Sequence, residues 1–159
     1  MAIALTLHIL VAVVWVGSMF FACLALRPAA ARLEPPQRLP LWVDTFARFF
    51  PWVWAAVILL PATGYWLILF VFEGFANAGA HVHVMQATGW IMIAVFLHLY
   101  FAPFRRLKKA TAAADWPAAG KQLAQIRRLV AFNLALGLVT VAVATGGRYL
   151  GDYLFYTRP

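Results

Sequence analysis

Residues 3–26 read IALTLHILVAVVWVGSMFFACLAL and contain no Asp, Glu, Lys or Arg. A helix needs about 20 apolar residues to cross the hydrocarbon core of a bilayer, so this stretch is long enough to span a membrane. No Lys or Arg precedes it, and its first positive charge, Arg27, follows it, unlike the pattern of a secretory signal peptide. We therefore expect it to stay in the mature protein as a membrane-spanning helix.

The rest of the chain has the same character. Of its 159 residues, 65% are hydrophobic and 11% are charged, whereas a soluble domain has about 25% charged residues. Apolar stretches predict four spans, at about 3–26, 51–72, 83–104 and 129–150. Residues 39–50 also have apolar side chains at helical spacing, which predicts either an interfacial helix or an early start of the second span. The predicted fold is all-α, an integral membrane four-helix bundle that forms a single domain over residues 1–159.

The basic residues, which give the chain a net charge of +8, cluster in two connections between the spans. Residues 27–50 hold four of them and residues 105–128 hold seven, whereas Arg148 and Arg158 alone belong to the C-terminal end. Positive charge marks the cytoplasmic connections of a membrane protein. We therefore expect a bacterial inner membrane protein with both termini on the outer side. No nucleic-acid motif accompanies the charge, so we expect the lipid bilayer and not nucleic acid as its partner.

Polar and ligand side chains gather on one face of the first span and on one face of the third. At about 100° per residue, the two stripes contain these residues: His8, Trp15, Met19 and Cys23 in the first, and His83, Gln86, Trp90 and His98 in the third. Ionisable side chains inside a membrane are costly and usually functional. The two spans run in the same direction, so we expect these stripes to face each other.

Aligning the two spans by Arg27 and Arg105 indicates which side chains share a depth in the membrane. His8 then lies within a turn of His83, and the next layer inward combines His98 with Met19. The two layers are about 22 Å apart by the helical rise. The sequence therefore predicts an outer and an inner ligand site.

Two cofactors suit the outer layer. Haem b needs two imidazoles on facing helices, which His8 and His83 would supply, with Trp15 nearby on the same face. Copper suits imidazole and thioether ligands. The corresponding capture site would consist of His8, His81, His83 and Met85. For the inner layer, His98 and Met19 predict a second haem, a quinone site or a proton site.

Four stretches resemble the helices of the copper-resistance D (CopD) family. They are LHILVAVVWVGSMFFACLALRPA (7–29), ARFFPWVWAAVILLPATGYWLI (47–68), HVHVMQATGWIMIAVFLHLYFAPFRRL (81–107) and IRRLVAFNLALGLVTVAVA (126–144). The same framework resembles the HemJ-type protoporphyrinogen oxidases, four-helix membrane proteins thought to carry haem b. In that resemblance His8 and His83 match the two histidines, and Met85 stands where those proteins have a lysine.

The sequence favours a haem-b-binding membrane redox protein that passes electrons between quinol, porphyrin or oxygen species and a partner. A chain with one Cys and four Met offers few soft ligands for a copper path. The alternatives are a copper uptake or tolerance protein of the CopD type and a non-catalytic membrane scaffold. The sequence leaves open whether the protein is an enzyme, such as a haem-dependent oxidoreductase, and whether it forms homo-oligomers.

Overall fold

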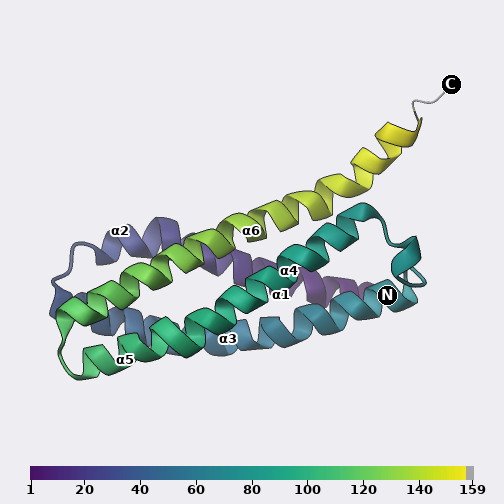
Figure 1. The fold of residues 1–159 in the computed structure, drawn as a ribbon. Helices are drawn as coiled ribbons and strands as arrows, with labels where there is room; N and C mark the ends of the chain where they lie inside the picture. The colour runs from purple at the N-terminus through teal and green to yellow at the C-terminus, as the bar shows by residue number, and fades with distance from the viewer. Residues whose placement is uncertain (157–159) are drawn as a thin grey trace.

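The computed structural model describes the backbone of residues 1–156 and the side chains of residues 1–147. Its α-helices are α1 (Ala2–Phe21), α2 (Arg27–Ala30), α3 (Pro35–Phe70), α4 (Ala80–Leu99), α5 (Arg105–Ala112) and α6 (Trp116–Tyr156) (Figure 1). Single π-helical turns, η1 (Ala22–Leu26) and η3 (Tyr100–Phe104), join α1 to α2 and α4 to α5. A 3₁₀ turn, η2 (Phe75–Asn77), lies in the connection from α3 to α4. The side chains of Arg148 and Arg158, which entered the charge count, lie outside the described residues.

Four continuous helical segments are long and apolar enough to cross a membrane. They are Ala2–Ala30, Pro35–Phe70, Ala80–Ala112 and Trp116–Gly147. The all-α, four-helix membrane fold is therefore confirmed, and the protein is a multi-pass membrane protein embedded in the lipid bilayer. The second span begins early, because α3 runs unbroken from Pro35 through Pro40, Pro51 and Pro61. Its 36 residues measure about 54 Å, longer than a hydrocarbon core of about 30 Å.

The long helices run alternately up and down the bundle (Figure 1). α1 packs mainly against α3 and also touches α6, whereas α4 packs mainly against α6. Two polar contacts join α4 to α6. The Asn133 side-chain amide donates to the Met92 carbonyl at 3.0 Å, and the Thr140 hydroxyl donates to the Thr88 hydroxyl at 2.7 Å. Aromatic rings fill the space between α3 and α4, including Trp54 against Phe96 with centroids 5.4 Å apart.

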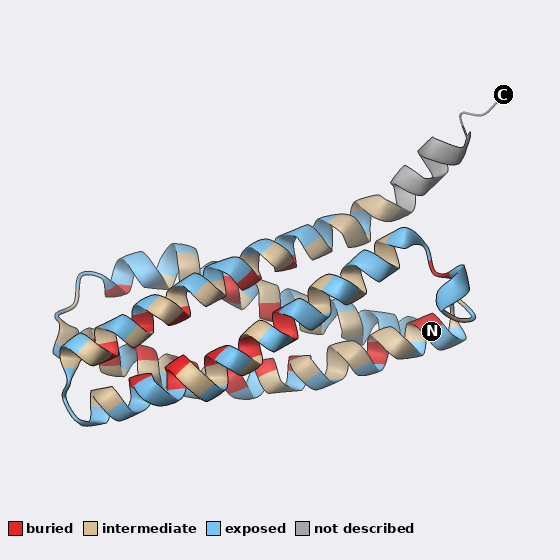
Figure 2. Cartoon of the chain, viewed as in Figure 1, coloured by how far each residue is buried: buried red, intermediate tan, exposed pale blue. Residues whose placement is uncertain are grey.

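The two ends of the bundle differ. We call the end that carries α2, α5 and the beginnings of α3 and α6 the basic end, and the end where α1 and α4 begin the His8 end. Buried residues are concentrated from the middle of the bundle towards the basic end (Figure 2). Towards the His8 end, the described side chains are mostly exposed or half-buried, and Thr63, Ile68 and Ala78 are the buried ones in the end of α3 and the following connection.

Candidate metal-binding site at the His8 end

His8 lies half-buried on α1 and contacts α3. Its Nδ1 is 2.8 Å from the Thr63 hydroxyl oxygen, and that hydroxyl in turn lies 2.6 Å from the Leu59 carbonyl. A threonine hydroxyl has one proton, which the Leu59 carbonyl accepts, so the Thr63 oxygen accepts a hydrogen bond from His8 Nδ1–H. The lone pair of the neutral imidazole is then on Nε2. A histidine held in this way has its ring orientation and tautomer fixed for metal ligation.

Gly64 leaves room for the His8 ring. A Cβ atom at this position would lie 3.4 Å from His8 Cε1, which is at the limit of ordinary van der Waals contact. Thr63 therefore supplies the polar anchor, and Gly64 lies against the ring. In the sequence, Thr63 and Gly64 belong to the stretch 47–68 that resembles a known helix, but neither was expected to contact His8. A polar Thr-Gly-Tyr run inside an otherwise apolar span was the signal that could have indicated this contact.

Tyr65 of α3 accepts hydrogen bonds from two polar side chains of α4. The Gln86 side-chain amide donates to the Tyr65 hydroxyl at 2.8 Å, and the Trp90 indole N–H donates to it at 3.2 Å. Thr63 and Tyr65 are two positions apart, so they point about 200° apart around the α3 axis. His8 therefore lies on a different flank of α3 from Gln86 and Trp90. Sequence reasoning did not identify Tyr65.

The HVHVM stretch forms the first turns of α4. His81 packs against α6, where a Cβ on Gly147 would lie 2.5 Å from His81 Cβ. His83 is exposed, and its ring stacks on Phe75 with centroids 6.3 Å apart. Met85 is half-buried. His81 and Met85 share a face of α4 because they are four positions apart, whereas His83 lies on another face.

The inner layer predicted from the sequence is not assembled in this structure. Met19 and Trp15 are buried, in agreement with the stripe predicted for the first span. α4, however, turns a different face to the core, made of Met92, Ile93, Phe96 and Leu99. His98 is exposed on roughly the opposite face of that helix. The packing of α4 on α6 sets this rotation about the helix axis. The pattern of polar residues within α4 alone could not predict it.

The kinds and positions of the possible ligand side chains decide which metal or cofactor could bind here. Among residues 1–147, no three or more His, Cys, Asp and Glu side chains lie close enough together to hold a metal ion. The described contacts do not pair His8 with His83 as a bis-histidine haem b would need: His8 bonds to Thr63 on α3, and the exposed ring of His83 stacks on Phe75. What remains is one oriented imidazole, His8, with imidazole and thioether side chains at the start of α4. Such a set suits a cuprous ion carried with few ligands better than a closed resident site.

The four membrane-spanning helices define a multi-pass membrane protein. Its oriented histidine, His8, marks one end of the bundle as the candidate ligand-binding site. The sequence model of the family described as Copper resistance protein D (CopD) matches residues 43–146. The chain belongs to this family. The matched range runs from α3 into α6 and includes Thr63 and the HVHVM stretch, but not His8. No curated protein and no solved structure matches the chain, and the similarity to HemJ-type oxidases stays a resemblance.

Proposed function

We propose that this protein handles copper as cargo at the His8 end of the bundle and so contributes to copper tolerance. The observation that carries the proposal is the hydrogen bond between His8 Nδ1 and Thr63, which leaves Nε2 of a neutral imidazole free to bind a metal. Membership of the CopD family supports copper over other metals. The proposal reverses the preference drawn from the sequence, which was for haem b with copper as the alternative.

The ligands proposed beside His8 are the side chains of the first turns of α4. Imidazole and thioether groups are suitable ligands for the cuprous ion. His81 and Met85, on one face of α4, would supply one of each, and His83 is the most exposed of the three. α4 begins at the same end of the bundle as α1 (Figure 1). Met19 and Cys23 lie four positions apart on the first span and are the proposed route further inward.

We propose that the His8 end faces the outer side of a bacterial inner membrane, with both termini there. The support is the distribution of positive charge, with eleven of the 13 Lys and Arg residues in the two connections at the opposite end. Copper would then meet His8 from outside the cell membrane. Labelling of single cysteines introduced at Ala78 and Ala113 tests the orientation, and labelling of Ala113→Cys from the outer side contradicts it.

The copper proposal is tested by Cu(I) titration of the detergent-purified protein against a chromophoric chelator. His8→Ala is expected to weaken Cu(I) binding strongly, because it removes the oriented imidazole. His98→Ala is the matched control, since it removes an exposed imidazole from another helix. A strain that depends on the protein for growth in copper should lose that tolerance with His8→Ala and keep it with His98→Ala. Equal Cu(I) affinity of His8→Ala and the unsubstituted protein contradicts the proposal.

The same preparation distinguishes haem b. Its visible absorption spectrum and a pyridine-haem assay report bound haem directly. A haem b band that disappears in His8→Ala and His83→Ala, in a protein without Cu(I) affinity, would replace copper by haem. A colourless protein that binds Cu(I) supports the copper proposal.

A further inference from the structure

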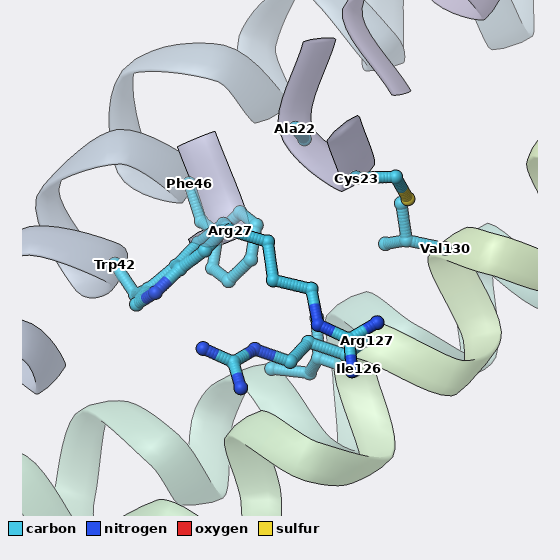
Figure 3. Close-up of a pocket in the computed structure, with 8 residues that line it drawn as sticks. All are labelled: Ala22, Cys23, Arg27, Trp42, Phe46, Ile126, Arg127 and Val130. Atoms are coloured by element: carbon cyan, nitrogen blue, oxygen red, sulfur yellow. The ribbon is translucent and has the colours of Figure 1, made fainter. Parts of the chain in front are cut away.

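Three arginine side chains come together at the basic end. Arg127 of α6 and Arg27 of α2 line one small pocket with Trp42 of α3, and Figure 3 shows the two arginines extending towards each other across it. Arg38 lies one turn before Trp42 on the same face of α3, and the charges of Arg27 and Arg38 both act on Arg127. The Arg127 guanidinium lies over the Trp42 ring, 5.5 Å from its centroid. The cluster thus joins three helices around concentrated positive charge.

Several donors of this cluster are buried and have no hydrogen-bond partner. They are Nε and Nη2 of Arg127, Nε of Arg38 and the indole Nε1 of Trp42. Trp42 is itself 2% exposed, so its N–H group has little access to water. Buried donors are normally satisfied, and each one left unpaired is costly. The acidic residues near this end, Glu34, Asp44 and Asp115, are exposed and bond to none of these four atoms.

Like charges held together with unpaired donors indicate a missing anion. Guanidinium groups bind phosphate oxygens through paired, charge-assisted hydrogen bonds. The pocket lies at the end of the spans where a lipid headgroup would meet the protein, and basic pockets between membrane helices bind such headgroups. The rest of its lining is mostly apolar, namely Ala22, Cys23, Phe46, Ile126 and Val130. A headgroup phosphate at the arginines would supply acceptors for the unpaired donors, with the acyl chains of the lipid in the surrounding bilayer.

We infer that Arg27, Arg38, Arg127 and Trp42 form a binding site for a phosphate group. The phosphate belongs either to an acidic phospholipid or to a soluble phosphate compound, since both present the same oxygens. The pocket is too small for a tetrapyrrole. Its donor residues lie at the opposite end of the bundle from His8, and of the residues proposed for copper only Cys23 lines the pocket.

The test compares Arg127→Gln with Arg128→Gln in delipidated protein. Both variants remove one positive charge from neighbouring positions of α6, but Arg128 is exposed and does not line the pocket. Phosphatidylglycerol is added in detergent, with phosphatidylcholine as the uncharged counterpart, and bound lipid is counted by native mass spectrometry. Phosphatidylglycerol binding is expected to fall at least about tenfold in Arg127→Gln and to stay unchanged in Arg128→Gln. Of these two arginines, only Arg127 offers buried donors to the phosphate.

A second arm uses inorganic phosphate and glycerol 3-phosphate against chloride at equal ionic strength, with the unfolding temperature as the readout. Stabilisation by these compounds that Arg127→Gln removes and Arg128→Gln keeps assigns the site to a soluble phosphate. Stabilisation by phosphatidylglycerol alone assigns it to the lipid. Trp42→Phe keeps an aromatic side chain and removes the indole N–H donor, so it should weaken binding less than Arg127→Gln. It takes the place of Arg127→Gln in the test if that variant does not fold. If the Arg127 and Arg128 variants behave alike in both arms, and Trp42→Phe has no effect, the inference is wrong.

Discussion

The two ends of this bundle are built on different physical grounds. At the basic end, Leu39, Trp42, Leu107, Ala119 and Ile126 are each 2% exposed or less, and rings stack from Trp42 through Phe46 to Phe50. At the His8 end, the helices meet through single hydrogen bonds, such as His8 with Thr63 and Gln86 with Tyr65. The first end buries apolar surface away from both water and lipid, and the second leaves most side chains partly open.

Because of this difference, we expect the basic end to contribute more of the folding stability and the His8 end to change conformation more easily. Regions with few buried apolar contacts open at lower free energy than a packed core, so side chains at the His8 end can rearrange more readily than those at the basic end. α3 links the two ends, because its 36 residues begin in the packed region and end at the His8 end. The comparison therefore predicts larger losses of stability for substitutions in the core at the basic end than for those at the His8 end, and effects on the proposed copper binding only at the His8 end.

The largest effect is expected for Leu107→Ala at the basic end. Leu107 is fully buried on α5, and removing a buried leucine side chain costs about 2–5 kcal/mol through lost burial and a residual cavity. Leu5→Ala on α1 is the control at the other end, since Leu5 is 41% exposed. Unfolding of the purified protein in detergent measures both. Equal losses of stability would remove the distinction between the two ends.

A smaller loss is expected for Gly147→Ala, where α6 meets the start of α4. An added Cβ would lie 2.5 Å from His81 Cβ and 3.8 Å from His81 Cα, so the helices must move apart, at about 1–3 kcal/mol for overpacking. Gly146→Ala is the matched control, because no atom lies within 4 Å of a Cβ at that position. The unfolding temperatures of the two variants test the prediction. If Gly147→Ala is as stable as Gly146→Ala, the His8 end adapts more easily than its contacts indicate.

The sequence alone predicted the fold class and the four spans, because uncharged stretches of membrane length admit few other structures. It also predicted the buried face of the first span, where Trp15 and Met19 are in the core. It placed the second span at 51–72 from its apolar length and left open whether residues 39–50 form an interfacial helix or an early start of that span. In the structure α3 runs through residues 39–50 into that span, and Phe50 packs on Phe96 and Phe104.

The candidate site was less predictable, because it depends on how each helix is rotated about its own axis. Periodicity shows which residues of one helix share a face but not which neighbour that face meets. His8 was expected opposite His83, yet it bonds to Thr63 on the helix between them in sequence. Asn133 of α6 donates to the Met92 carbonyl, and this buried contact helps to fix the rotation that leaves His98 exposed. The ligand roles of His83, His81 and Met85 stay predictions.

Thr63→Val tests whether the contact of His8 is functional. Valine has nearly the same shape as threonine but cannot accept the Nδ1–H hydrogen bond, so the ring loses its fixed tautomer and orientation. Loss of such a supporting contact typically weakens metal affinity about 10–100-fold. Thr45→Val is the control on the same helix, since the Thr45 hydroxyl bonds only to its own backbone at Leu41. Cu(I) titration measures both, and an unchanged affinity in Thr63→Val would mean that His8 needs no anchor.

The smallest effect is expected for Thr140→Val, which removes a hydroxyl pair between α4 and α6. The Thr140 and Thr88 oxygens are 2.7 Å apart, and each hydroxyl also lies near a carbonyl of its own helix, Leu136 and Val84 respectively. Because Thr88 keeps its backbone partner when Thr140 is replaced, the loss should be near the 0.6 kcal/mol or so typical of hydrogen bonds between membrane helices. Thr145→Val, whose hydroxyl bonds only within α6, should cost less still, as unfolding in detergent would measure. A loss of several kcal/mol for Thr140→Val would mean that α4 and α6 are held together towards the His8 end as firmly as the basic end is by its apolar core.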